Sequence, residues 1–308
     1  MSSPPENRSI RSTVVGIVAP SGYEPDPLAG ARADALLLAQ GCEVRHFDVP
    51  DARYLRFADT DTARLAGLHA AACDPEVDVV LTLRGGYGMS RLLQAIDFDL
   101  LVKSGKLFAG FSDITALHLG LLAHGGMSFA GPTVVDFGTL DVSDFTMSQF
   151  WHVLHGPVHV VTARTSDIAP VDVRGTLWGG NLAMVAHMTG TPWMPAIEGG
   201  ILFLEDINEH PYRIERMLLQ LLHAGILDRQ KAIVLGDFSG GRTSDYDNGY
   251  DFSAMLAFVR TRTDVPIVTG LPFGHIRDKT TLVVGADATL RVEAGQLQLS
   301  MHDYPHLR

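Results

Sequence analysis

The chain has 308 residues, 46% of them hydrophobic and 19% charged, which is the composition of a folded globular protein and excludes a disordered or collagen-like one. Its formal net charge is -11, with 24 Lys and Arg against 35 Asp and Glu and no basic run, so the basic surface that a nucleic-acid partner requires is missing. At this length two domains are expected.

The N-terminal segment, residues 1–12, is polar and lacks the apolar stretch of a signal peptide, and no later segment reaches the length of a membrane span. The two cysteines, Cys42 and Cys73, have neither Cys-x-x-Cys spacing nor enough partners for a structural zinc site. We therefore predict a cytoplasmic protein with two reduced thiols and no contact with a membrane.

The first half of the chain alternates between strand and helix patterns. Short β-branched or apolar runs that end at loop residues predict strands, and apolar residues at helical spacing predict helices. The predicted strands are 13–19, 42–49, 78–83 and 106–109, and the predicted helices are 28–40, 62–72, 90–96 and 113–124. This alternation indicates a parallel sheet with helices on both faces, which binds ligands beyond the carboxyl ends of its strands. The stretches 84–88 and 110–113 lie at such ends.

The alternation lapses between about residues 136 and 172, where Gly138, Gly156, Pro157 and Pro170 occur. We place the domain junction in this least regular part of the chain. The expected division is an N-terminal domain over 1–140, a linker region over 141–172 and a C-terminal domain over 173–308.

The second half resumes the α/β pattern and then changes. Strands are predicted at 200–204, 231–235 and 265–269, and helices at 212–223 and 252–260. The tail from 280 to 300 alternates apolar and polar residues, as antiparallel strands with one solvated face do. We expect a second, smaller α/β domain that includes antiparallel strands.

Ser112, in the stretch Gly110-Phe111-Ser112-Asp113, stands where a strand should end and a helix begin. Such a sharp turn exposes a side chain at the mouth of the sheet and directs helix N-terminal N–H groups at an incoming oxyanion. The stretch departs from Gly-x-Ser-x-Gly because Ile114 replaces the last glycine. The alternative is a serine that caps the following helix.

The turn Gly85-Gly86-Tyr87-Gly88 also follows a buried strand, and its N–H groups are not obstructed by bulky side chains. It could complete an oxyanion hole or hold a substrate carboxylate, or it could be a plain tight turn. It lacks the spacing of Gly-x-Gly-x-x-Gly and of a Walker A loop, which argues against a nucleotide phosphate.

The stretch 204–210 (LEDINEH) ends a predicted strand with three carboxylates and a histidine, a set that also resembles a metal cluster or a general acid/base pair. His210 has no second histidine at helical spacing, which a zinc site often uses. Among 13 histidines, His275 stands apart because it follows a strand end beside Gly274, where its ring could approach another domain; a loop histidine is the alternative.

Six segments together resemble, in order along the chain, the landmark motifs of the LD-carboxypeptidase family of serine peptidases, which use a Ser-Glu-His triad. They are 19–23 (APSGY), 83–88 (LRGGYG), 110–113 (GFSD), 175–182 (GTLWGGNL), 204–209 (LEDINE) and 270–275 (GLPFGH). The resemblance spans nearly the whole chain. It implies a flavodoxin-like N-terminal sheet domain, and an active site in the groove between the two domains.

Carried over by position, the resemblance makes Ser112 the nucleophile, His275 the general base and Glu205 the carboxylate that orients the histidine. The backbone N–H groups of Asp113 and Gly86 would form the oxyanion hole. No metal or other cofactor is implied. For substrate binding, Arg84 is a hypothesis for the terminal carboxylate, and Trp178 and Asn181 are hypotheses for the lining of the cleft, with a core tryptophan as the alternative.

The implied substrate is the murein tetrapeptide, free or sugar-linked, cut between meso-diaminopimelate and the terminal D-alanine during cytoplasmic recycling of the cell wall, and the implied assembly is a homodimer. A second hypothesis within the family is a microcin-immunity-like hydrolase of peptidyl or aminoacyl adenylates, which should present an added aromatic loop near the cleft. A third is a protein that binds muropeptides without cutting them.

Overall fold

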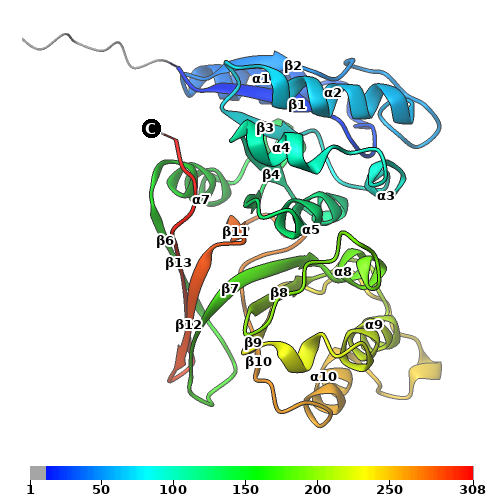
Figure 1. Cartoon of the computed structure of the whole chain (residues 1–308). Helices are drawn as coiled ribbons and strands as arrows, with labels where there is room; N and C mark the ends of the chain where they lie inside the picture. The colour runs from blue at the N-terminus through cyan, green and yellow to red at the C-terminus, as the bar shows by residue number, and fades with distance from the viewer. Residues whose placement is uncertain (1–11, 308) are drawn as a thin grey trace, which may run out of the picture.

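The structure, a computed structural model, describes residues 12–307 (Figure 1). The expectation about a signal peptide falls, apart from Ser12, outside the described residues. In the described part, no helix is both long and apolar enough to cross a membrane.

The first sheet has six strands, five of them from the N-terminal part of the chain. They are β1 (Val14–Val18), β2 (Glu43–His46), β3 (Val79–Thr82), β4 (Leu107–Gly110), β5 (Ser128–Ala130) and β11 (Leu282–Val284). The spatial order is β11-β5-β4-β3-β1-β2, and all neighbours are parallel except β11, which runs antiparallel to β5. Without β11, this is the strand order of flavodoxin-like sheets. The predicted parallel sheet is confirmed.

Seven helices accompany this sheet in the described chain, and most begin at a polar cap. They are α1 (Ala29–Ala39), α2 (Asp61–Cys73), α3 (Met89–Leu92), α4 (Phe98–Ser104), α5 (Thr115–Ala123), α6 (Val134–Gly138) and α7 (Asp144–His155). Thr60 caps α2 by accepting from the N–H of Ala63 at 3.3 Å, and Asp97 caps α4 by accepting from Leu100 at 2.9 Å. These bonds satisfy N–H groups that have no partner within the helix.

The second sheet has seven strands and changes character along its width. They are β6 (Val158–Arg164), β7 (Val171–Asn181), β8 (Ile201–Glu205), β9 (Ala232–Leu235), β10 (Ile267–Thr269), β12 (Asp287–Glu293) and β13 (Gln296–His302). In the order β10-β9-β8-β7-β12-β13-β6, the first four strands are parallel and the rest are antiparallel. Helices α8 (Leu182–Met188), α9 (Pro211–His223) and α10 (Phe252–Arg260) accompany its parallel half. The predicted second α/β region with antiparallel strands is confirmed.

The stretch 136–172, where the alternating sequence pattern lapses, contains α7 and β6. Ser143 caps α7 by accepting from the N–H of Thr146 at 3.1 Å, and α7 buries Met147, Phe150 and Leu154, which lie on one helical face. The chain also returns to the first sheet through β11, so residues after 173 contribute to both sheets. The division at 140 and 173 stays a prediction.

The two sheets meet at α5. This helix contacts β5 of the first sheet as well as β7 and α8 of the second, and Figure 1 shows it between the two halves. Buried apolar residues from both sheets form one continuous core. Both sheets therefore pack against α5, and Ser112 lies in the segment that leads into this helix.

Candidate active site

Ser112 lies in a strained turn between β4 and α5. Its φ is +65°, and Gly110 before it has a φ of +156° in a position where a Cβ would come within 2.1 Å of the Thr82 hydroxyl. A positive φ is costly for a residue with a side chain and persists where the surroundings enforce it. A short 3-10 helix, Ser112–Ile114, comes before α5. The capping position of the 3-10 helix is Phe111 and that of α5 is Ile114, and neither side chain forms a cap hydrogen bond. The backbone thus turns as in a nucleophile elbow, and Ser112 is not a helix cap.

The glycine turn after β3 packs directly against this elbow. A Cβ on Gly85 would lie 2.7 Å from the Ser112 Cβ and 3.2 Å from the Asp113 nitrogen. Gly86 has a φ of +101°, which favours glycine. Only a residue without a side chain lets the turn approach so closely, and the approach places the Gly85-Gly86 backbone beside the N–H of Asp113.

The Asp113 carboxylate holds three loops together, a role that the sequence interpretation missed. Its Oδ2 accepts from the Ser21 hydroxyl at 2.5 Å and from the N–H of Met89 at 2.9 Å. These partners follow β1 and β3, while Asp113 itself follows β4. The available signal was position alone, since the carboxyl ends of parallel strands meet at one edge of the sheet.

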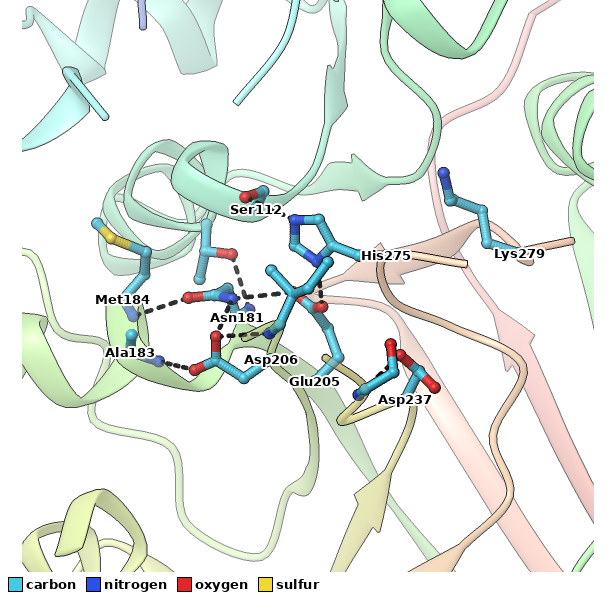
Figure 2. Close-up of polar contacts among 12 residues, drawn as sticks. Ser112, Asn181, Ala183, Met184, Glu205, Asp206, Asp237, His275 and Lys279 are labelled. Atoms are coloured by element: carbon cyan, nitrogen blue, oxygen red, sulfur yellow. Dashed lines mark hydrogen bonds and ion pairs between the residues drawn. The ribbon is translucent and has the colours of Figure 1, made fainter. Parts of the chain in front are cut away.

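His275 and Glu205 reach Ser112 from the second sheet (Figure 2). The Nε2 atom of His275 lies 3.1 Å from the Ser112 Oγ, and its Nδ1 lies 2.7 Å from the Glu205 Oε2. Glu205 is the last residue of β8 and is fully buried. With Nδ1–H donating to the carboxylate, Nε2 is free to accept the serine proton. The predicted residues are thus brought together in a hydrogen-bonded chain.

Gly274 permits the close approach of this loop to Glu205. Its φ is +135°, and a Cβ there would lie 3.3 Å from the Glu205 Oε2 and 3.1 Å from the Asp237 Cβ. On its other side, the His275 ring packs against Phe111 with ring centroids 4.9 Å apart. The imidazole is therefore fixed both by its hydrogen bonds and by its packing.

Behind Glu205 lies a second buried carboxylate, Asp206. The Asn181 Nδ2 donates to the Glu205 Oε1 at 3.2 Å and to the Asp206 Oδ1 at 3.0 Å, as Figure 2 shows. Asp206 also accepts from the N–H groups of Ile207 and Ala183, each at 2.9 Å. Burial raises the pKa of Asp206 to about 6, although these hydrogen bonds act in the opposite direction.

His118 of α5, behind the elbow, is a core residue. It is fully buried, with Nε2 2.8 Å from the Gly110 carbonyl and Nδ1 2.8 Å from the Ser128 hydroxyl. Burial lowers the pKa of His118 to about 4, so the ring is neutral at neutral pH. Nε2–H then donates to Gly110, and Nδ1 accepts from Ser128.

A groove of about 360 Å³ opens over Ser112. The residues lining it come from loops at the carboxyl ends of the first sheet and from the His275 loop, and they are Glu24, Pro25, Arg84, Gly85, Gly86, Phe111, Ser112, Thr133, Val135, Asp136 and His275. The cation of this lining is Arg84. Its Nη1 donates to the Tyr23 carbonyl at 3.0 Å and lies 3.7 Å from the Glu24 carboxylate.

The opposite wall holds a charged pair. The Lys279 ammonium, nearly buried, donates to Asp136 and lies 4.5 Å from the centre of the Phe111 ring. Asp136 also accepts from the N–H of Thr133 at 2.8 Å. Figure 2 shows Lys279 on the side of His275 away from Asn181. The charge of Asp136 is thus compensated inside the wall.

Two of the hypothetical substrate contacts lie away from the groove. Trp178 is in the core, 1% exposed, where its Nε1 donates to Gln230 at 2.9 Å; the expectation that it lines the cleft is wrong, and the alternative of a core tryptophan holds. Asn181 is buried and bonded to both carboxylates, so it supports Glu205 and does not line the groove.

The carboxylates and histidine of 204–210 do not converge on one point. Glu209 lies 3.6 Å from Arg213, and His210 lies 3.1 Å from Asp247 while capping α9. Over residues 12–307, no three His, Cys, Asp or Glu side chains are grouped so that they could hold a metal ion. Within this stretch it is Glu205 that faces Ser112 through His275.

Comparison with known proteins places these features in a family. Residues 15–131 match the model of the LD-carboxypeptidase N-terminal domain, and residues 174–290 match that of the C-terminal domain. A putative carboxypeptidase of Streptomyces coelicolor is 37% identical over 92% of both chains. The murein tetrapeptide carboxypeptidase of Pseudomonas aeruginosa is 32% identical over 78% of this chain and 81% of its own.

Solved structures show the same fold. The crystal structure of muramoyltetrapeptide carboxypeptidase from Oxalobacter formigenes is 53% identical, with a TM-score of 0.91, covering 95% of this chain and all of that one. The microcin C7 self immunity protein MccF in its wild-type apo state is 20% identical, with a TM-score of 0.84 and coverage of 96% and 97%. At that identity the second likeness shows the fold alone.

Proposed function

The chain belongs to the LD-carboxypeptidase family, and from that membership we propose that it releases the terminal D-alanine of murein tetrapeptide, with Ser112 as the nucleophile. Family membership makes the protein a hydrolase of the serine peptidase type. The single observation that carries the assignment of residues is the hydrogen-bonded chain from Ser112 through His275 to Glu205, which joins two separate sheets.

The proposed reaction follows from the positions of these three side chains. The Nε2 atom of His275 takes the proton of the Ser112 hydroxyl while Oγ attacks the carbonyl carbon between diaminopimelate and D-alanine. The C–N bond breaks, and the imidazolium returns the proton to the leaving amine, which leaves as D-alanine. Water, deprotonated by the same imidazole, then attacks the acyl carbon; the bond from that carbon to Oγ breaks, the imidazolium returns the proton to the Ser112 Oγ, and the shortened peptide is released.

Backbone N–H groups would hold the oxyanion during both steps. We assign this role to Asp113 and Gly86, because the turn lies so close to the elbow that a Cβ on Gly85 would meet the Ser112 Cβ at 2.7 Å and the Asp113 nitrogen at 3.2 Å. Glu205 keeps Nδ1 of His275 protonated and stabilises the imidazolium.

Support for the substrate comes from relatives and from the groove. Proteins similar to this chain are named for murein peptides, murein tetrapeptide and muramoyltetrapeptide. A carboxypeptidase must bind a free terminal carboxylate, and Arg84 is the cation that lines the groove beside Ser112. Action in the cytoplasm, on free or sugar-linked tetrapeptide, and pairing as a homodimer belong to the same proposal.

The hydrolysis of adenylates is not favoured by the groove. An adenylate-cleaving hydrolase should present an added aromatic loop near the cleft, and among the described residues that line the groove Phe111 is the only Phe, Tyr or Trp. Its ring packs on His275. The likeness to the microcin immunity protein therefore adds nothing beyond the fold.

The test is release of D-alanine from purified murein tetrapeptide, measured for the wild type and for Ser112→Ala. We expect turnover by the wild type and a loss of about 10³-fold or more in the variant. Ser148→Ala, which removes an exposed serine hydroxyl of α7 that lies 3.2 Å from His152 Nδ1, is the matched control and should turn over like the wild type. Undiminished turnover by Ser112→Ala would remove Ser112 from its role.

A further inference from the structure

We propose that Asp206 is a positioning residue of this active site: through the shared amide of Asn181 it holds Glu205 in the orientation that aligns His275 with Ser112. The inference rests on the proposed function in one respect, namely that this serine is the reacting group. It goes beyond that proposal by assigning a role to a second buried carboxylate that the reaction itself does not use.

The contacts of Asp206 leave its carboxylate no freedom to turn. The side chain is 4% exposed, its Oδ1 accepts from the Ile207 N–H and the Asn181 amide, and its Oδ2 accepts from the Ala183 N–H at the start of α8. Its own backbone N–H donates to the Asp237 carbonyl at 3.1 Å. Three donors, from β7, α8 and the loop after β8, thus fix both oxygens of the carboxylate.

Asn181 converts this fixed carboxylate into an orientation of Glu205. Its Oδ1 accepts from the N–H of Met184 as the cap of α8, so the Nδ2 group must face the two carboxylates. Each of the two Nδ2 hydrogens then has one acceptor, Glu205 or Asp206. Figure 2 shows the amide between them. If Asp206 were absent, the amide could turn away from Glu205.

Asn181 also connects this network to the segment that carries Ser112. The backbone N–H of Asn181 donates to the Thr115 hydroxyl at 3.0 Å, and a Cβ on Gly180 would lie 2.4 Å from that hydroxyl. Thr115 is the first residue of α5, three residues after Ser112. Asp206 therefore acts on a network that spans the junction between the two sheets.

Charge gives Asp206 a second effect. The titratable groups around it are Glu205 on β8, His275 beyond Glu205 and Asp237 after β9; its remaining partners are backbone amides and Asn181. An additional buried negative charge near Glu205 favours the protonated state of the imidazole in the transition state. Because the pKa of Asp206 is raised to about 6, protonation of the carboxyl at lower pH removes this charge.

The experiment measures the second-order rate constant at which a serine-directed phosphonylating reagent labels Ser112. This reaction requires an activated serine but no peptide substrate. In Asp206→Asn the labelling rate should fall about 10- to 100-fold. The acid limb of its pH profile should move to lower pH, since a negative charge that favours protonation of the site is gone. On tetrapeptide, kcat should fall while KM stays within about threefold.

The matched control is Asp167→Asn. Asp167 is another carboxylate beside a strand of the second sheet, and it accepts from the Thr269 N–H at 2.7 Å and from Arg260, neither of which belongs to the triad or to the Asn181 network. Its substitution should leave the labelling rate and its pH profile unchanged. Equal rates for the Asp206 and Asp167 variants, or an Asp206 effect confined to KM, would overturn the proposal.

A second variant covers the case in which Asp206→Asn does not fold. Asn181→Gly keeps a residue type that can stand at the start of a helix but removes the amide, and it should lower the labelling rate by a similar factor. Full reactivity in that variant would contradict the role of the amide. A wild type that is labelled but releases no D-alanine would refute the proposed substrate and leave this test intact.

Discussion

The imidazole Nε2 of His275 lies 3.1 Å from the hydroxyl Oγ of Ser112, although 163 residues separate the two in the chain. Ser112 follows β4 of the first sheet, and His275 follows β10, a parallel strand at the edge of the second. The contact therefore exists only when both sheets are packed on α5. Activity should depend on that packing as much as on the three side chains themselves.

Gly85→Ala should abolish most of the activity with the reacting side chains intact. The added methyl group would meet the Cβ of Ser112 at 2.7 Å and its Oγ at 3.0 Å, so either the turn or the serine must move. We expect kcat/KM to fall by about 100-fold, because small displacements of reacting groups carry large costs, and stability to fall by about 1–3 kcal/mol. D-alanine release and urea unfolding measure the two effects.

Gly30→Ala is the control for that substitution. Gly30 lies within α1, and a Cβ there meets nothing within 4 Å. Alanine should raise stability by about 0.5–1 kcal/mol and leave kcat/KM unchanged. Wild-type activity in Gly85→Ala would show that the turn does not need its close approach to Ser112.

Arg84→Ala should raise KM for tetrapeptide by about 10- to 100-fold and change kcat little, because a charge-assisted bond to the terminal carboxylate is lost. A tetrapeptide whose terminal carboxylate is converted to an amide separates this role from others, since on it the variant and the wild type should perform alike. Steady-state kinetics on the two substrates provide the comparison.

Arg91→Ala is the matched arginine. Its guanidinium bonds to Asp61 at 2.8 Å and is not part of the groove lining, although it stands only seven positions further along the chain. Its KM should equal that of the wild type. If Arg84→Ala raised KM as much for the amidated tetrapeptide as for the tetrapeptide with a free carboxylate, Arg84 would not be the carboxylate ligand.

His118 should make the protein less stable in acid. Its folded pKa of about 4 lies below the unfolded value of 6.5, so the unfolded chain binds the proton first and stability falls as pH drops from 6.5 to 4. The loss from this residue is about 3 kcal/mol. The gap in free energy of unfolding between wild type and His118→Gln should therefore narrow from pH 7.5 to pH 4.5.

Two other buried groups titrate in the same range, which is why the variant must be compared with the wild type. The pKa of His159 is also lowered to about 4 by burial and adds to the acid loss. The pKa of Asp206 is raised to about 6, so the folded state binds that proton first and gains stability between pH 6 and 4. A difference in free energy of unfolding between wild type and His118→Gln that stays constant with pH would contradict a neutral, buried His118.

Much of the fold was predictable because each half repeats a strong local pattern. The buried strand β3 and the helix α9, begun by Pro211, appear almost at their expected bounds. The stretch containing β6 was missed because Val158, Val160 and Val161 are all apolar although only alternate residues are buried, which hides the period of two. In α7 the apolar residues have helical spacing, but the Gly and Pro residues around this stretch favoured the interpretation as a linker.

The site was only partly predictable, for a different reason. A serine at a strand-to-helix turn looks the same whether it caps the helix or carries the chemistry, and the positive φ that separates the two is a property of the backbone. The network of Asn181 and Asp206 depends on β7 and β8 lying side by side in register, with Asn181 opposite Glu205. Nothing in the local sequence specifies that pairing.

The central claim is that Ser112 is activated by His275 across the junction of the two sheets. The most direct measurement treats wild type, Ser112→Ala and His275→Ala with a serine-directed phosphonylating reagent and locates the adduct by mass spectrometry of the peptides. We predict stoichiometric modification at Ser112 in the wild type, none in Ser112→Ala, and labelling slowed about 10³-fold or more in His275→Ala. Labelling at another serine, or an undiminished rate without His275, would contradict the account, and a wild-type serine that resists the reagent would mark a protein that binds muropeptides without cutting them.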